Sequence, residues 1–188
     1  RVSYTDRGGR TVKIERSGPS DEAATFTVPG RADRARMFTP DEVAGIVDAF
    51  GALTLDETTE ALSELAYRRG ESPPEGAVED ALYAFALVSF ERGGEELLAP
   101  GPAAFPELPE GAEDLPHILE IERRSVDRSA IARAAVDRLR TEAVCAATLG
   151  DSERADSLLE VSYDLETWGE LDLSGIRERL DAASDGTN

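Results

Sequence analysis

Residues 37–101 read MFTPDEVAGIVDAFGALTLDETTEALSELAYRRGESPPEGAVEDALYAFALVSFERGGEELLAPG. Apolar residues recur at helical spacing in three successive blocks of this stretch, and two short alternating runs follow around a Gly-Gly turn. Three helices followed by a two-stranded ribbon is the order found in a winged helix-turn-helix. We therefore predict a winged-helix-like three-helix unit plus a β-hairpin over 37–102, in a chain that is mainly α.

Capping signals set the limits of the first two helices. Thr39 stands three residues before Glu42, and Thr54 stands three residues before Glu57, which is the spacing of a capping box. Gly70 follows the second apolar block and favours the end of that helix. The further predicted elements are a helix near 75–87, strands over 87–91 and 96–99, a short strand over 117–121, and helices over about 127–149, 152–166 and 174–183.

The chain divides into four segments by composition. These are an N-terminal hairpin or loose arm (1–36), the winged-helix-like domain (37–102), a Pro- and Glu-rich connection (103–119) and a C-terminal helical subdomain (120–184) that packs on it. Within the connection, Phe105, Leu108 and Leu115 are the apolar residues expected to hold the segment against the core.

The first segment differs from the rest in charge. Residues 1–36 hold eight cations and five carboxylates, a net of +3, which leaves −22 for residues 37–188. The only methionine, Met37, lies where the composition changes, so one interpretation is that translation starts there and residues 1–36 are a mis-assigned start. The less favoured alternative is a basic arm that binds nucleic acid.

The overall composition is that of a soluble globular protein. Of 188 residues, 40% are hydrophobic and 31% are charged, and no apolar run is long enough to cross a membrane or to act as a secretory signal. A single cysteine is in keeping with a cytoplasmic location. A net charge of −19 with only one lysine is typical of a protein from a halophilic archaeon, because a dense carboxylate surface keeps proteins hydrated and apart in high salt.

The charges of the third predicted helix argue against DNA binding. Between Glu71 and Glu91 the chain has no Lys, Arg, Asn or Gln, the residues that contact phosphates and base edges. Glu75, Glu79 and Asp80 occur there instead, and carboxylates repel phosphates. A winged-helix-like scaffold used for protein contacts, or simply for folding, is therefore favoured over direct DNA binding.

A run of arginines lies further along the chain, over 123–140. Six arginines and two carboxylates give this run a local charge of +4. The candidate residues for contact with a partner or an anion are Arg124, Arg128, Arg133, Arg138 and Arg140. The alternative, which we favour, is that Arg128, Arg133 and Arg138 pair within the molecule with the acidic body or with Asp127 and Asp137 along the helix.

No catalytic, metal or cofactor motif is recognisable. His117 and Cys145 are the only residues of their kinds, so they form neither a zinc site nor a known nucleophile signature, and Cys145 is expected to be a small buried residue. Tyr163 and Trp168 are expected to pack in the core rather than mark an interface. We therefore expect a protein that is not an enzyme and needs no cofactor.

Most of the chain, from 39 to 180, resembles an uncharacterised haloarchaeal protein family, a domain of unknown function. The resemblance rests on four segments: TPDEVAGIVDAFGALTLDE (39–57), LSELAYRRGE (62–71), GPAAFPELPEGAEDLPHIL (101–119) and VSYDLETW (161–168). It begins close to Met37 and therefore favours a start near that residue. The resemblance implies no activity and no functional residues.

These observations together predict a non-enzymatic cytoplasmic protein of a halophilic archaeon that acts as a protein-interaction or regulatory module. The expected partner is another protein or a second copy of the chain, with no membrane. The alternative is a winged-helix-type transcriptional regulator that contacts DNA through its Arg-rich helix, so nucleic acid remains the less favoured partner.

Overall fold

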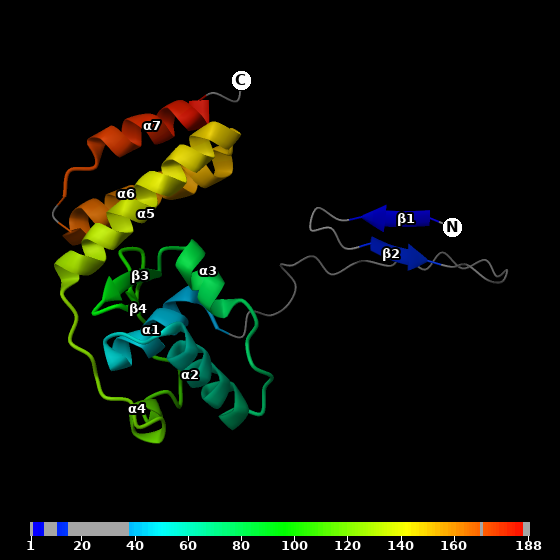
Figure 1. The fold of residues 1–188 in the computed structure, drawn as a ribbon, viewed down its shortest axis with the longest axis vertical. Helices are drawn as coiled ribbons and strands as arrows, with labels where there is room; N and C mark the ends of the chain where they lie inside the picture. Colours follow the sequence, from blue (N-terminus) through cyan, green and yellow to red (C-terminus); the bar gives the residue numbers. More distant parts are fainter. Residues whose placement is uncertain (1, 6–10, 15–37, 170, 186–188) are drawn as a thin grey trace. The chain divides into compact units, whose positions relative to one another are not determined.

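The computed structural model describes residues 2–5, 11–14, 38–169 and 171–185, which belong to two compact units, 1–35 and 36–188 (Figure 1). In the first unit, β1 (Val2–Thr5) pairs antiparallel with β2 (Thr11–Ile14), as the predicted hairpin requires. The remaining predictions for the N-terminal segment lie outside the described residues.

The second unit is mainly helical, as expected, with one antiparallel strand pair. Its elements are α1 (Pro40–Phe50), α2 (Leu55–Arg68), α3 (Ala77–Tyr83), β3 (Leu87–Arg92), β4 (Glu95–Pro100), α4 (Leu115–Ile118), α5 (Arg128–Leu149), α6 (Ser152–Gly169) and α7 (Ser174–Asp185). None of the helices in the described part of the chain combines the length and the apolar character needed to cross a bilayer.

The capping boxes form at both predicted positions. The Thr39 hydroxyl accepts from the amide of Glu42, and the Glu42 carboxylate accepts from the amide of Thr39. Thr54 and Glu57 make the same reciprocal pair at the start of α2. Two of the unpaired amides at each helix start are thereby satisfied, which is why purely local sequence signals located both helices.

Two predicted elements were wrong. The third helix ends at Tyr83 rather than near 87, because Phe85 adopts a φ of 57° that a helix does not allow, while its ring is fully buried. The short strand predicted over 117–121 is instead the helix α4, whose Leu115 is completely buried.

Phe105 was expected to hold the connection to the core, but 79% of it is exposed.

The β3–β4 hairpin is buried on both faces. Gly93 and Gly94 form its two-residue turn with φ values of 66° and 86°, the left-handed geometry that suits a tight hairpin. Because side chains alternate along a strand, residues 87 and 98 point to one face, and the pairs 88–99 and 90–97 point to the other.

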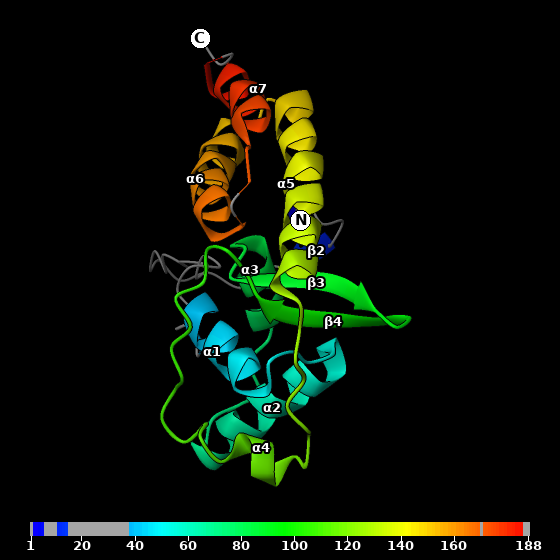
Figure 2. The same ribbon diagram turned by 90° about the vertical axis from the view of Figure 1, so that its left-hand side faces the viewer.

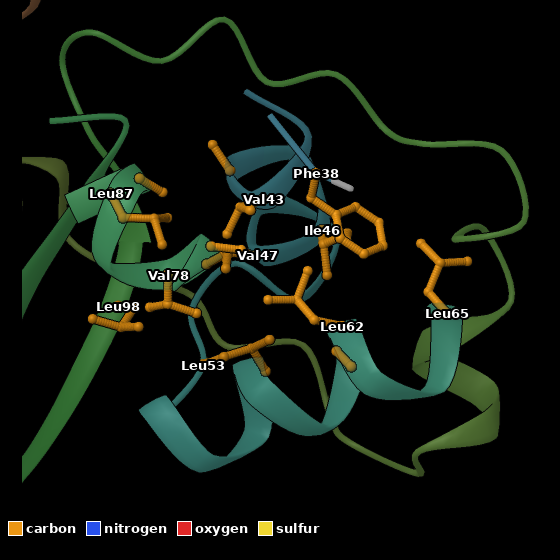
Figure 3. Packing of buried hydrophobic residues seen from close by; sticks show 14 of the residues in the cluster. Phe38, Val43, Ile46, Val47, Leu53, Leu62, Leu65, Val78, Leu87 and Leu98 are labelled. Carbon is orange, nitrogen blue, oxygen red and sulfur yellow. The ribbon is translucent and has the colours of Figure 1, made fainter. Parts of the chain in front are cut away.

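The two faces of the hairpin belong to two different hydrophobic cores. Leu87 and Leu98 pack with α1, α2 and α3, and Figure 3 shows them beside Val78. The residues of the opposite face pack with α5, α6 and α7, which lie together at one end of this unit (Figure 2). These residues are Val88, Phe90, Leu97 and Ala99. The hairpin therefore separates the N-terminal helices from the C-terminal ones.

The connection from β4 to α5 is fastened along the N-terminal helices. Phe105 and Glu107 donate their amides to the side chain and the carbonyl of Asp41, at 2.9 and 3.1 Å. Arg68 and Arg69 donate to carbonyl oxygens in the 110–111 turn at 3.2 and 2.7 Å. The chain is thus guided around α1 and α2 before it reaches α5.

A glycine pair tests how closely this connection is packed. A Cβ added at Gly45 would lie 2.1 Å from the carbonyl oxygen of Glu107, whereas one added at Gly175, near the start of α7, meets no atom within 4 Å. We expect Gly45→Ala to lower the free energy of unfolding by about 1–3 kcal/mol through overpacking. Gly175→Ala should raise it by about 0.5–1 kcal/mol because alanine restricts the unfolded chain. Chemical denaturation measures both, and equal effects would contradict the close approach.

Candidate functional site

The exposed surface of α3 carries negative charge. Glu79, Asp80 and Tyr83 are exposed on this helix, and the sequence from 71 to 91 contains no Lys, Arg, Asn or Gln. The buried side of α3 is apolar, with Val78 and Ala81 facing α1. The exposed surface of α3 therefore presents carboxylates, whereas a DNA-binding surface presents cations.

The hairpin adds one exposed cation, which is hydrogen-bonded to the chain before α5. Arg92 is the only cation among residues 87–100, and its Nη1 donates to the carbonyl oxygen of Ser125 at 2.7 Å. A hollow of about 380 Å³ lies between this part of β3 and the start of α5, lined by Phe90 and by the side chains of Arg92 and Asp127 among others. Its charged lining residues are Glu91, Arg92 and Asp127, a net of −1, so the hollow does not favour an anion.

Arg124 fastens the end of the connection to α1 and α2. Its two terminal nitrogens donate to the two carboxylate oxygens of Glu57 at 2.7 and 2.8 Å, and one also reaches the carbonyl oxygen of Ala52 at 3.1 Å. This bidentate hydrogen bond lowers the pKa of Glu57 and raises that of Arg124. The guanidinium is thus committed to an internal pair.

Arg138 and Arg154 share one carboxylate at the junction between α5, α6 and the hairpin. Glu142 accepts from Nε of Arg138 at 2.7 Å and from Nε of Arg154 at 3.0 Å. Arg154 also donates to the carbonyl oxygen of Tyr83 at 3.0 Å, at the end of α3. Only 8% of Arg154 is exposed, so this charge depends on its hydrogen-bond partners for its stability.

Aromatic rings complete the junction. The guanidinium of Arg138 lies 4.0 Å from the ring centroid of Phe85, and that of Arg154 lies 3.8 Å from the ring centroid of Tyr83. Nη1 of Arg138 is buried without a hydrogen-bond partner, and the adjacent ring face is its neighbour in this structure. We call Arg138, Glu142, Arg154, Tyr83 and Phe85 the junction cluster.

Arg154 was missed by the sequence analysis, although a signal was present. Position 154 shares the spacing of Leu158, Val161 and Leu165, which form the buried face of α6. An arginine on an apolar helical face needs a carboxylate partner. The spacing therefore marked Arg154 as an internal residue, but it did not identify Glu142 as the partner.

The other three candidate arginines are exposed on α5. Arg128 stacks over Trp168 at 4.4 Å, and Arg140 pairs with Asp137 at 3.2 Å in an exposed i,i+3 arrangement. Arg133 contributes to the lowered pKa of Asp127, which is due mainly to hydrogen bonds from Ser129. The structure therefore places Arg124 and Arg138 in internal pairs and leaves Arg128, Arg133 and Arg140 at the surface.

His117 and Cys145 lie on different helices, α4 and α5, and both are exposed. The prediction that Cys145 is buried was therefore wrong, because it lies on the outer side of α5. Tyr163, expected in the core, is 54% exposed, while Trp168 is half-buried against the second core. Among the described residues, no group of His, Cys, Asp and Glu is arranged to hold a metal ion.

Comparisons with known proteins give a family but no activity. Residues 41–185 match the model of a family of unknown function, DUF7109. No curated protein and no solved structure matches the chain.

Two acidic residues of α5 separate the role of the junction cluster from that of a surface pair. Glu142→Gln leaves the buried Arg154 without its carboxylate, and we expect a loss of about 3 kcal/mol in unfolding free energy. Asp137→Asn makes the same chemical change at a pair that is 59% and 76% exposed, and should cost less than about 0.5 kcal/mol. Denaturant titration of both variants tests this, and a small effect of Glu142→Gln would show that the cluster does not hold the junction.

Proposed function

The chain belongs to the DUF7109 family, and from that premise we propose that it is a non-enzymatic protein-interaction or regulatory module built on a winged-helix-like scaffold. We also propose that the chain is a haloarchaeal, cytoplasmic protein. Its charge of −19 and its single lysine support this.

The order and pairing of the elements support the winged-helix-like assignment. Between α1 and α2, Leu53 makes an antiparallel bridge to Leu98, with N–O distances of 3.0 and 2.7 Å. The bridge joins the segment after the first helix to the hairpin that follows the third helix. A helix, this bridging segment, two further helices and a hairpin follow one another in the order of a winged-helix fold.

The observation that carries the functional proposal is the acidic exposed surface of α3. Cationic side chains that neutralise DNA phosphates release counterions from the DNA, and this release favours binding. Glu79 and Asp80 carry negative charge instead, which repels phosphates. The adjacent arginines, Arg138 and Arg154, are held by Glu142 in the junction cluster. A scaffold of this kind is suited to contacts with protein.

One observation favours the second candidate, a transcriptional regulator. Arg123, Arg128, Arg133 and Arg140 are exposed at or near the N-terminal half of α5. Exposed arginines on one helix can contact phosphates even when the third helix cannot. In that case DNA would bind to α5 and not to α3.

Isolation of the tagged full-length chain from its source organism, at the salt of its cytoplasm and without nuclease, tests the proposal. We expect a protein partner, or untagged copies of the chain, in stoichiometric amounts and no specific nucleic acid. Recovery of specific DNA without protein would contradict the proposal and favour the regulator.

A pair of variants identifies the surface responsible in either case. The double change Arg128→Glu and Arg133→Glu should abolish any DNA recovered through α5. Arg179→Glu reverses an exposed charge on α7 and is the matched control. Loss of DNA with the double variant alone would assign the second candidate, whereas loss of DNA with Arg179→Glu as well would indicate a general charge effect.

A further inference from the structure

A hollow of about 180 Å³ lies between α2 and the start of α3. Among its lining residues, Leu62 and Val78 are 2% and 6% exposed and belong to the first core, so the hollow opens onto the edge of that core. Leu55, which also lines it, is 53% exposed. We call it the α2–α3 hollow, and its other lining residues are Thr59, Pro74, Gly76, Ala77 and Glu79.

The α2–α3 hollow suits a single apolar side chain. Its lining includes only one charged residue, Glu79, and the Thr59 hydroxyl already donates to the carbonyl oxygen of Leu55 at 2.8 Å. Pockets for small molecules measure about 300–1,000 Å³, so this hollow is too small to enclose a whole small ligand. An apolar side chain that enters it covers Leu55 and leaves water itself, and both changes are favourable.

The segments that form the two walls of the hollow carry negative charge and no cation. Residues 54–67 and 70–83 contain eight carboxylates and neither Lys nor Arg. Asp56 and Glu60 are exposed on α2, each directly after a lining residue, and Glu79 is exposed on α3. None of these three forms an ion pair with another residue that the structure describes. The hollow therefore has unpaired carboxylates on both walls.

The arginines that border these segments are engaged elsewhere. Arg68 and Arg69, which lie between the two segments in sequence, donate to carbonyl oxygens of the 110–111 turn. Arg124 binds Glu57, which lies on the side of α2 away from the hollow. The carboxylates beside the hollow thus keep their charge available for a partner.

We propose that the α2–α3 hollow binds a segment of a partner protein that places one large apolar side chain in the hollow and Arg or Lys residues on both sides of it. The inference rests on the proposed function and gives the chemistry of the protein partner. Charge complementarity identifies this occupant, because carboxylates on both walls attract cationic side chains. The same carboxylates repel the phosphates of nucleic acids and of anionic lipids.

Salt determines which part of the contact contributes most to the affinity. The Debye length is about 3 Å at molar salt, so only cations in direct contact with Asp56, Glu60 or Glu79 are then attracted. The apolar contact involves no charge and is not screened. The affinity should therefore fall from low to molar KCl and then depend mainly on the apolar side chain.

NMR titration of the full-length chain in molar KCl tests the proposal. The probe is a synthetic peptide, blocked at both ends, in which a central leucine has a pair of arginines on each side. We expect the amides around the α2–α3 hollow to shift, with a dissociation constant below about 1 mM. Matched peptides with serine in place of leucine, or with glutamate in place of arginine, should bind at least about tenfold more weakly.

Two pairs of variants locate the contact on the protein. Leu55→Ser should weaken peptide binding by about fivefold or more. Val144→Ser is its control, since Val144 on α5 is 52% exposed against 53% for Leu55. Glu79→Lys should also weaken binding by about fivefold or more, whereas Glu178→Lys makes the same charge change at an exposed position of α7 and should have little effect. All four side chains are exposed, so the circular dichroism spectra should be unchanged.

Three results of the titration would overturn the inference. The first is no binding at millimolar peptide, and the second is a set of shifts that lies outside the hollow. The third is equal binding of the serine peptide, which would show that charge alone attracts the probe.

Isolation of the chain from its source organism separates this inference from the proposed function. A protein partner that is recovered undiminished with the double variant Leu55→Ser and Glu79→Lys overturns the inference and leaves the proposed function intact. Recovery of specific DNA without protein contradicts the proposed function, and the inference fails with it because it rests on a protein partner.

Discussion

The fold depends on a two-stranded hairpin that is buried on both faces. A two-stranded ribbon is barely stable alone, because it buries little apolar surface. Here Leu87 and Leu98 contribute to one core, and Val88, Phe90 and Leu97 contribute to the other. The same backbone hydrogen bonds therefore support the packing of both sets of helices. The hairpin keeps only its tip, over 91–96, in solvent, so it is a structural partition more than a mobile wing.

Arginine side chains form ion pairs that join the helices and the connection of this acidic molecule. Arg124 holds the connection to α2, Arg138 and Arg154 hold α5 and α6 to the end of α3, and Arg177 pairs with Glu166 between α7 and α6. A planar guanidinium can bind a carboxylate through two parallel hydrogen bonds and still stack on a ring, which lysine cannot do. Cations that would otherwise be available to bind phosphate are thereby used to assemble the fold.

Local signals predicted the parts of the structure that depend on a few neighbouring residues. The capping boxes at Thr39 and Thr54 and the Gly-Gly turn of the hairpin are of this kind. The end of α3 was missed because Phe85 takes its positive φ where the buried hairpin and the junction cluster surround it. A hydrophobic pattern in the sequence does not report such a distant constraint.

The residues of the candidate site likewise divide into those that the sequence predicted and those whose surroundings depend on distant parts of the chain. Internal pairing was the favoured alternative for Arg128, Arg133 and Arg138, and the structure shows an ion pair for Arg138; Arg124, for which it was not predicted, also forms one. The partner Glu57 is distant in sequence, so its identity depended on the path of the connection around α1 and α2. The exposure of Cys145 was missed because an alanine-rich helix resembles a buried one, and only the position of the second core shows which of its sides faces solvent.

Amide hydrogen exchange of the full-length chain tests the central claim that the hairpin is a buried partition. If both of its faces belong to cores, the amides of β3 and β4 outside the exposed tip (91–96) should exchange as slowly as the slowest amides of α5, because they open only when the whole unit unfolds. Exchange of the β3 and β4 amides as fast as that of the exposed hairpin tip would contradict the account and show that the hairpin is an independently mobile wing.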